Sequence, residues 1–281
     1  MTERQRQRQW RKTQAKRDRF AKAMAREWRV ALMGQIEPVL KEIDPSTVDS
    51  IEARIPALIR EDLIEAQLMR NISLVGAYFA GAAYRNISKA YAPQVTHKAD
   101  EIPKDEEWVT SVLSTLGQKA GVRITAITDE SRAQAIAVVQ QTLQQAAEEG
   151  MGTSQMSVLL RDNMKEHWGD ISTYRAARIA RTETTMASNL GSLTGAIKTG
   201  EPMLKVWLST RDSRTRRGRG RNNFDHYGTY PAGPDGEKAE LNKDFQKTGE
   251  PLEHPGDYKG SAGNVIHCRC TMFYEPIETD L

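Results

Sequence analysis

The only two cysteines of the chain, Cys268 and Cys270, lie one residue apart in the segment IHCRC. In an extended strand the side chains alternate between two faces, so the thiols would be neighbours and Arg269 would face the other way, toward a carboxylate or a partner. The two Cα atoms would lie ~6.5–7 Å apart, at the upper edge of the disulfide range, which disfavours a direct bridge. The pair could instead supply half of a tetrahedral structural zinc site, completed by His226 and His254. The alternative is that both thiols are small buried apolar groups.

A second polar cluster suggests a different chemistry. The cluster consists of Asp212, Asp225, His226 and His254. Carboxylates beside a histidine can hold magnesium or activate water, which is the chemistry of a metal-dependent nuclease or processing enzyme. The arginine-rich segment at 211–221 is more simply a surface for nucleic acid or a partner, or a solvated loop. No G-x-S-x-G motif and no phosphate-binding glycine motif occurs. We therefore expect no enzymatic activity and keep the nuclease as the alternative.

The N-terminal segment is strongly cationic. Residues 1–29 carry eleven Lys and Arg against three acidic residues. Apolar residues recur every fourth position from Phe20 to Leu32, which predicts a helix with one buried stripe. The cations are predicted to contact DNA or a partner subunit, and the alternative is a solvated helix docked on its own domain. The candidate binding residues are Arg4, Arg6, Arg8, Arg11, Lys12, Lys16, Arg17 and Arg19.

The remaining pattern predicts an α+β fold, with a mostly α-helical N-terminal two thirds and a small, loop-rich α+β C-terminal domain. Pro38 and the segment DPST are expected to end the first helix, and a polar linker is expected at 91–108. A helix should follow TDES at 128–131, then a short helix, then a long helix that Gly200 ends. Strands are predicted at 203–210 and 265–274. The expected domains are a basic helical arm at 1–45, a helical domain at 46–169 and a C-terminal domain at 170–281.

Targeting signals are not evident in the sequence. No run approaches the roughly 18 apolar residues that a membrane span needs, and the N-terminus lacks the apolar stretch of a secretory signal. Two cysteines cannot build a disulfide framework. We therefore expect no membrane partner, and synthesis in a reducing cytoplasm.

The order of features at 170–276 resembles the phage Mu F-like head morphogenesis family, minor capsid proteins of tailed phages. A helix with ARTET is followed by KVWLSTRDSRTR, a histidine, the turn HPGD and the terminal IHCRC. The segment RRGRGRNNFD is an insertion relative to the family pattern and lengthens the gap between Asp212 and His226. The family positions carried over to this chain are Arg181, Thr182, Glu183, Trp207, Asp212, Arg214, His226, Pro255, Gly256, Asp257, Cys268, Arg269 and Cys270.

The resemblance implies a structural role in the virion. Such proteins lie in the head near the portal vertex in a few copies, after assembly in the host cytoplasm. The implied partners are the portal protein, the major capsid or scaffold proteins and packaged double-stranded DNA, bound without sequence specificity. From the residues themselves we also expect Arg181, if buried, to be held by a carboxylate such as Asp212, which would fix the ARTET helix to the strand region.

Overall fold

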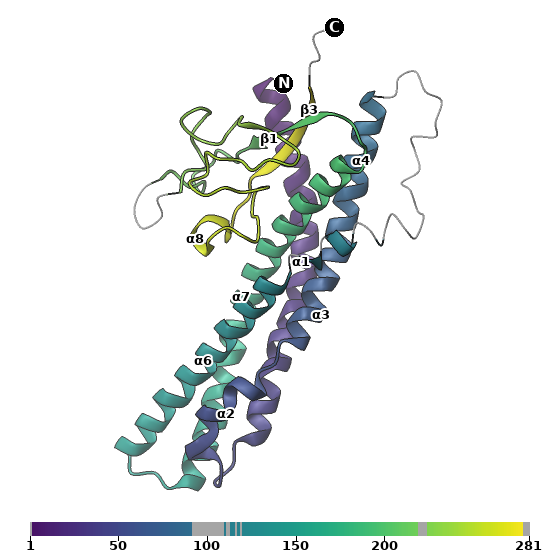
Figure 1. Ribbon diagram of the computed structural model, residues 1–281. Coiled ribbons are helices and arrows are strands. Elements are labelled where there is room, and N and C mark those ends of the chain that lie inside the picture. Colours follow the sequence, from purple (N-terminus) through teal and green to yellow (C-terminus); the bar gives the residue numbers. More distant parts are fainter. Residues whose placement is uncertain are drawn as a thin grey trace. The chain divides into compact units, whose positions relative to one another are not determined.

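The computed structural model describes residues 2–91, 110, 113–115, 117–118, 120–218 and 224–277 (Figure 1). It confirms the α+β class, with long helices and one small antiparallel sheet. Of the linker expected at 91–108, residue 91 ends α4, whereas residues 92–108 lie outside the described residues, as do residues 219–223 of the arginine-rich loop. The longer helices are α1 (Glu3–Glu42), α2 (Ile51–Leu58), α3 (Asp62–Asn71), α4 (Ala77–Tyr91), α6 (Gly121–Glu148) and α7 (Thr153–Ile197), and a short α8 covers Ala262–Val265. None of the helices in this described part combines the length and apolarity needed to cross a bilayer.

The chain divides into two compact units, each assembled from separate segments. We call the first the sheet-bearing unit, which comprises Met1–Ala21, Arg70–Lys119 and Arg181–Leu281. The second, the helical unit, comprises Lys22–Met69 and Ala120–Ala180. This division differs from the three consecutive domains expected from the sequence, because α1 and α7 each contribute one part to each unit.

The core of the helical unit is formed by apolar side chains of α1, α2, α6 and α7. Ile36, Ile51, Val139 and Trp168 are among its fully or almost fully buried members. The indole N–H of Trp168 donates a hydrogen bond of 2.8 Å to the carbonyl oxygen of Leu32. The apolar stripe predicted on the first helix is therefore buried, as its spacing indicated.

Three helix boundaries differ from the sequence expectation. Pro38 lies inside α1 rather than ending it, since the neighbouring Ile36 and Val39 are buried and their packing outweighs one lost backbone hydrogen bond. Ser131 does not cap a helix; it is buried within α6 and its hydroxyl donates to the Gln35 side chain at 2.8 Å. The short and long helices predicted before Gly200 are the single helix α7.

The sheet contains β1 (Met203–Leu208), β2 (Lys238–Glu240) and β3 (Thr271–Pro276), in the order β2-β1-β3 with both pairs antiparallel. Trp207 of β1 pairs with Met272 of β3. The last strand begins at Thr271, so the predicted strand at 265–274 was wrong in its first half. The chain is helical up to Val265 and then passes through His267, whose φ of 60° lies in the left-handed region.

The π-helical turn Ile72–Gly76 and helix α4 after it approach α7 closely within the sheet-bearing unit. A Cβ atom added to Gly191 would lie 2.2 Å from the carbonyl oxygen of Gly76, and one added to Gly195 would lie 2.1 Å from that of Ala80. Both glycines are therefore required by the close approach of the two backbones. This contact fixes the C-terminal part of α7.

Candidate functional site

His226, Cys268 and Cys270 form a group of metal-ligand type within the sheet-bearing unit. One ligand atom from each lies within 4.8 Å of the other two, and all three side chains are buried. The Nδ1 atom of His226 is 3.7 Å from Sγ of Cys268 and 3.8 Å from Sγ of Cys270. It is the only such group of His, Cys, Asp and Glu among the described residues. The two free thiols are neighbours, as the one-residue spacing predicted.

The orientation of His226 is fixed by Asn264. The Asn264 amide nitrogen donates to the Glu250 carboxylate at 3.0 Å and to the Thr248 carbonyl at 3.3 Å, so its oxygen is the acceptor on the other side. That oxygen lies 2.6 Å from Nε2 of His226. Nε2 therefore carries the proton, and the lone pair of Nδ1 faces the two thiols. A histidine that binds a metal usually donates its other ring N–H in this way.

The loop that carries His226 is held at several points. The Asp225 carboxylate accepts hydrogen bonds from the backbone N–H groups of Tyr227 at 2.7 Å and Gly228 at 3.0 Å. The hydroxyl of Ser209 donates to the carbonyl oxygen of His226. The indole ring of Trp207 meets the imidazole edge-on, with 5.4 Å between the ring centroids. The imidazole is thus positioned by its own turn and by β1.

The thiols titrate as a coupled pair. A hydrogen bond from Cys270 lowers the pKa of Cys268, although burial opposes this. The same hydrogen bond and burial raise the pKa of Cys270. One thiolate is therefore favoured next to one thiol and one imidazole lone pair, which is a soft donor set of the kind that zinc prefers.

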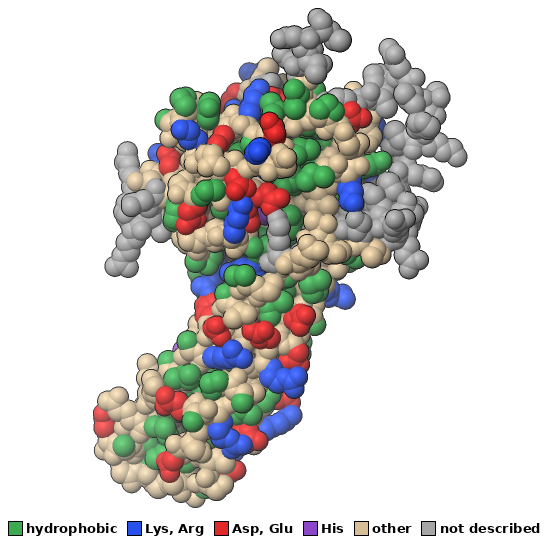
Figure 2. Space-filling view, in the orientation of Figure 1, with side chains coloured by type: hydrophobic (Ala, Val, Ile, Leu, Met, Phe, Trp, Pro, Cys, Tyr) green, Lys and Arg blue, Asp and Glu red, His purple; other side chains and the backbone are tan. Residues whose placement is uncertain are grey.

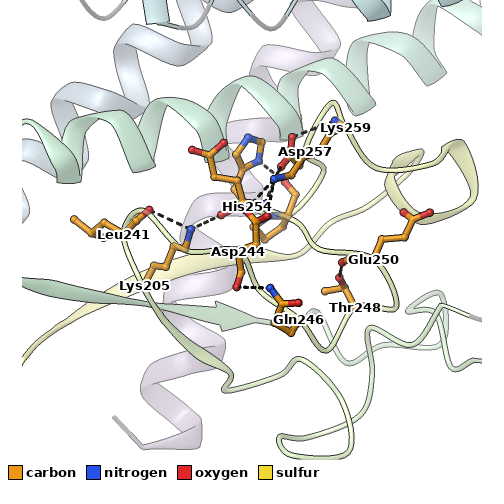
Figure 3. Close-up of polar contacts among 11 residues, drawn as sticks. Lys205, Leu241, Asp244, Gln246, Thr248, Glu250, His254, Asp257 and Lys259 are labelled. Atoms are coloured by element: carbon orange, nitrogen blue, oxygen red, sulfur yellow. Dashed lines mark hydrogen bonds and ion pairs between the residues drawn. The ribbon is translucent and has the colours of Figure 1, made fainter.

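His254, the expected fourth ligand, is not in this group. Its Nδ1 lies 3.2 Å from the carbonyl oxygen of Pro255, within the network shown in Figure 3. There the backbone N–H of Glu253 donates to the Asp257 carboxylate at 2.8 Å. Although burial opposes it, the nearby His254 helps to lower the pKa of Asp257. The described ligand set therefore has three members rather than four.

Lys205 is the second charged centre of that network. Its ammonium group donates to the carbonyl oxygens of Leu241 at 3.2 Å and Glu253 at 2.7 Å (Figure 3). Its side chain is buried, and burial lowers the pKa of Lys205 to about 8. Lys259 binds the Asp244 carboxylate at 2.8 Å nearby. These contacts tie the loops after β2 to β1.

The four residues of the expected nuclease cluster are not brought together. Asp225 caps its own turn and His226 faces the thiols, while His254 lies beside Asp257. Asp212 binds Arg269 through two hydrogen bonds of 2.6 and 2.5 Å. Asp212 and His226 thus lie in separate contacts.

Arg269 was predicted to face away from the thiols toward a carboxylate or a partner. That carboxylate is Asp212. The contact expected between Asp212 and Arg181 was conditional on burial of Arg181, and that condition is not met. Arg181 is exposed, whereas Thr182 and Glu183 after it are buried. The hydroxyl oxygen of Thr182 accepts a hydrogen bond of 3.4 Å from the backbone N–H of His267. The ARTET segment thus meets IHCRC through its threonine.

Arg17 is buried rather than available to DNA, which corrects the prediction for this residue. Its guanidinium donates to the Ser188 hydroxyl at 2.6 Å, to the Asn189 side-chain oxygen at 2.5 Å and to the Cys270 carbonyl at 3.0 Å. A fourth bond of 3.2 Å reaches the Thr271 hydroxyl. Burial lowers the pKa of Arg17 to about 10, so it remains a cation at neutral pH.

Arg6 is also engaged within the protein. It is partly buried and pairs with the Asp235 carboxylate at 2.5 Å. The other candidate cations of α1 are exposed, namely Arg4, Arg8, Arg11, Lys12, Lys16 and Arg19. On the face of the molecule shown in Figure 2, basic and acidic side chains are interspersed. The exposed cations of α1 remain the predicted DNA or partner contacts.

Asn189 and Asn264 are the important polar residues that the sequence reasoning did not single out. The Asn189 amide nitrogen donates to the carbonyl oxygens of Pro255 at 2.7 Å and Cys270 at 3.1 Å. For Asn189, the sequence signal that could have indicated its role is the position of an asparagine among the small and apolar residues of the long helix. A polar side chain in such a position is usually satisfied by a specific partner.

Comparisons with known proteins assign no family. No protein-family model, no curated protein and no solved structure matches the chain. The functional argument therefore rests on the sequence motifs and on the geometry of the site.

Replacement of Arg17 by Met tests its structural role. Because the substitution leaves buried acceptors on Asn189 and Cys270 without this donor, we expect the free energy of unfolding to fall by about 1–3 kcal/mol. Urea denaturation followed by circular dichroism measures the change. Arg19→Met, at an exposed position of the same helix, should leave stability close to that of the wild type. Equal effects of the two substitutions would contradict the anchoring role.

The ion pair of Asp212 with Arg269 predicts a pH dependence. Hydrogen bonding to Arg269 lowers the pKa of Asp212 from 3.8 to about 2. The pair therefore stabilises the fold above pH 3.8, and this contribution is lost as the pH falls through about 2. We expect Asp212→Asn to lower Tm at neutral pH, with the difference from wild type shrinking over this acidic range.

Thermal melts of both proteins across that range provide the measurement. Asp162→Asn, at an exposed position of α7, is the control and should follow the wild type at every pH. A difference between wild type and Asp212→Asn that stays constant down to pH 2 would argue against the ion pair as the cause.

Proposed function

We propose that this protein is a non-enzymatic minor capsid protein of a tailed phage, acting in head morphogenesis near the portal vertex. One observation carries the proposal: segments that give the family resemblance, far apart in sequence, each contact the IHCRC segment. Asp212 binds Arg269, Thr182 accepts from the backbone of His267, and His226 faces Cys268. Residues that bind one another in this way support an architectural role for the motifs.

The proposed partners follow from the resemblance and from the charge of α1. The portal protein and the major capsid or scaffold proteins would hold the chain in the head. Packaged double-stranded DNA would contact the exposed cations of α1 through its phosphates, without reading sequence. Arg17 is not among these contacts because it is buried.

The location of the protein tests this proposal. We expect it in purified virions at low copy number, which quantitative mass spectrometry of particles measures. Absence from heads would overturn the proposal. Incubation of the purified protein with DNA and magnesium or manganese should give no cleavage, whereas metal-dependent cleavage would support the nuclease alternative.

We also propose that the group of His226, Cys268 and Cys270 holds a structural zinc ion. The donor set fits, because two sulfurs and an imidazole nitrogen converge and Asn264 fixes the ring with Nδ1 toward the thiols. A zinc ion there would join the loop after β1 to the segment before β3.

Metal analysis tests the zinc assignment. We expect the purified protein to contain one zinc per chain, and Cys268→Ser combined with Cys270→Ser to lose the metal and lower Tm, because the thiolate ligands are removed. His254→Gln is the matched control, since His254 lies outside the ligand group and its substitution should preserve the zinc content. Wild-type protein free of zinc, or equal metal content in all three proteins, would refute the assignment.

A further inference from the structure

A groove of about 670 Å³ lies within the sheet-bearing unit, on the side of IHCRC where His267 and Arg269 are found. Helix α1 contributes Trp10, Arg17 and Asp18 to its lining, and α7 contributes Arg181. Arg214 from the loop after β1 completes the charged part of the lining. The groove therefore gathers side chains from four separate segments of the chain.

The charge of this groove is predominantly positive. Arg17, Arg181, Arg214 and Arg269 line it, whereas Asp18 is the one carboxylate among the lining residues. Asp212 lies next to the groove and neutralises Arg269, with which it forms a close pair. Its distance to Arg214 is longer, 3.9 Å. The formal charge of the lining together with Asp212 is therefore positive, from four arginines and two carboxylates.

Arg17 makes this excess significant. Its side chain is 2% exposed, and every hydrogen bond that it makes among the described residues goes to a neutral group. No described carboxylate forms a salt bridge with it. A buried cation is costly, and a bound anion in the adjoining groove would add to the favourable electrostatic interactions of Arg17 with Cys268, Cys270 and Asp18. The groove therefore has a buried arginine beneath its lining in addition to exposed arginines.

We propose that this groove binds phosphate groups of a nucleic-acid backbone through Arg181 and Arg214. Arg17, which is buried beneath the lining, adds positive electrostatic potential. Arginine suits this ligand because its planar fork forms paired hydrogen bonds with phosphate oxygens. Trp10 lines the same groove and is half-buried, so it offers an aromatic surface to a base or sugar. The inference rests on the proposed function, which brings DNA to this protein, and it adds the place of contact.

Binding of a fluorescein-labelled DNA duplex, followed by anisotropy over a salt series, tests the proposal. Arg181→Gln combined with Arg214→Gln should weaken binding and reduce the slope of log K against log salt by about 0.9 for each lost phosphate contact. The matched control is Lys243→Gln combined with Lys247→Gln, which removes the same charge from exposed positions outside the groove. The control should keep the wild-type affinity and slope.

A second substitution keeps the test decisive if the arginine variant is unstable. Asp18→Asn removes the carboxylate from the lining without removing a cation. We expect tighter DNA binding, whereas a purely structural groove would show no change. Thermal melts of every variant show whether folding is retained.

Competition experiments distinguish a preference for phosphate groups from a preference for carboxylate groups. A tripolyphosphate chain should displace DNA from the wild type and much less from the arginine variant. Equal losses in the arginine and lysine variants would overturn the proposal by showing that only total charge matters. Stronger displacement by polyglutamate than by tripolyphosphate would overturn it in favour of an acidic polypeptide. If the arginine variant binds DNA like the wild type while the protein is found in virions, the proposal for the groove is refuted and the proposed function is retained.

Discussion

The buried guanidinium of Arg17 is the interaction on which the sheet-bearing unit depends most. It joins α1 to Ser188 and Asn189 of α7 and to the carbonyl oxygen of Cys270 before β3. A desolvated cation must be satisfied by hydrogen bonds, and the planar guanidinium permits only one arrangement of the surrounding acceptors. One side chain therefore sets the relative positions of three segments that are far apart in sequence.

The candidate metal group follows from this constraint. Both Arg17 and Asn189 donate to the carbonyl oxygen of Cys270, so the backbone that carries the thiols is held from one side. On the other side His226 meets the thiols, and Asn264 holds its ring. Arg17, Asn189 and Asn264 thus hold the thiol-bearing backbone and the imidazole by specific hydrogen bonds, which explains how a loop-rich region with a three-stranded sheet maintains a defined site.

The same arrangement separates two chemical environments around IHCRC. The thiols of Cys268 and Cys270 point into the interior with His226, whereas Arg269 pairs with Asp212 beside the positively charged groove. A soft ligand set and a surface suited to anions thus share one short segment. The first would stabilise the fold and the second would contact a partner, so the two proposals do not compete for the same atoms.

The sequence pattern predicted much of the fold where short-range periodicity governs it. The buried stripe from Met24 to Leu32 and the strand at β1 are examples, since burial of apolar side chains follows directly from their spacing. Pro38 and Ser131 misled the prediction of helix ends, because their local preferences were outweighed by packing and by a buried hydrogen bond to Gln35.

The sequence by itself determined the α+β class, the proximity of the two thiols and the need of Arg269 for a counter-ion. Spacing of one residue and the cost of an unpaired charge are local properties. Only the tertiary structure decided that Asp212 is that counter-ion, that His226 rather than His254 joins the thiols, and that Arg17 is buried. Each of these choices depends on which distant segments meet, and that is settled by the packing of α1, α7 and the loops around β1 together.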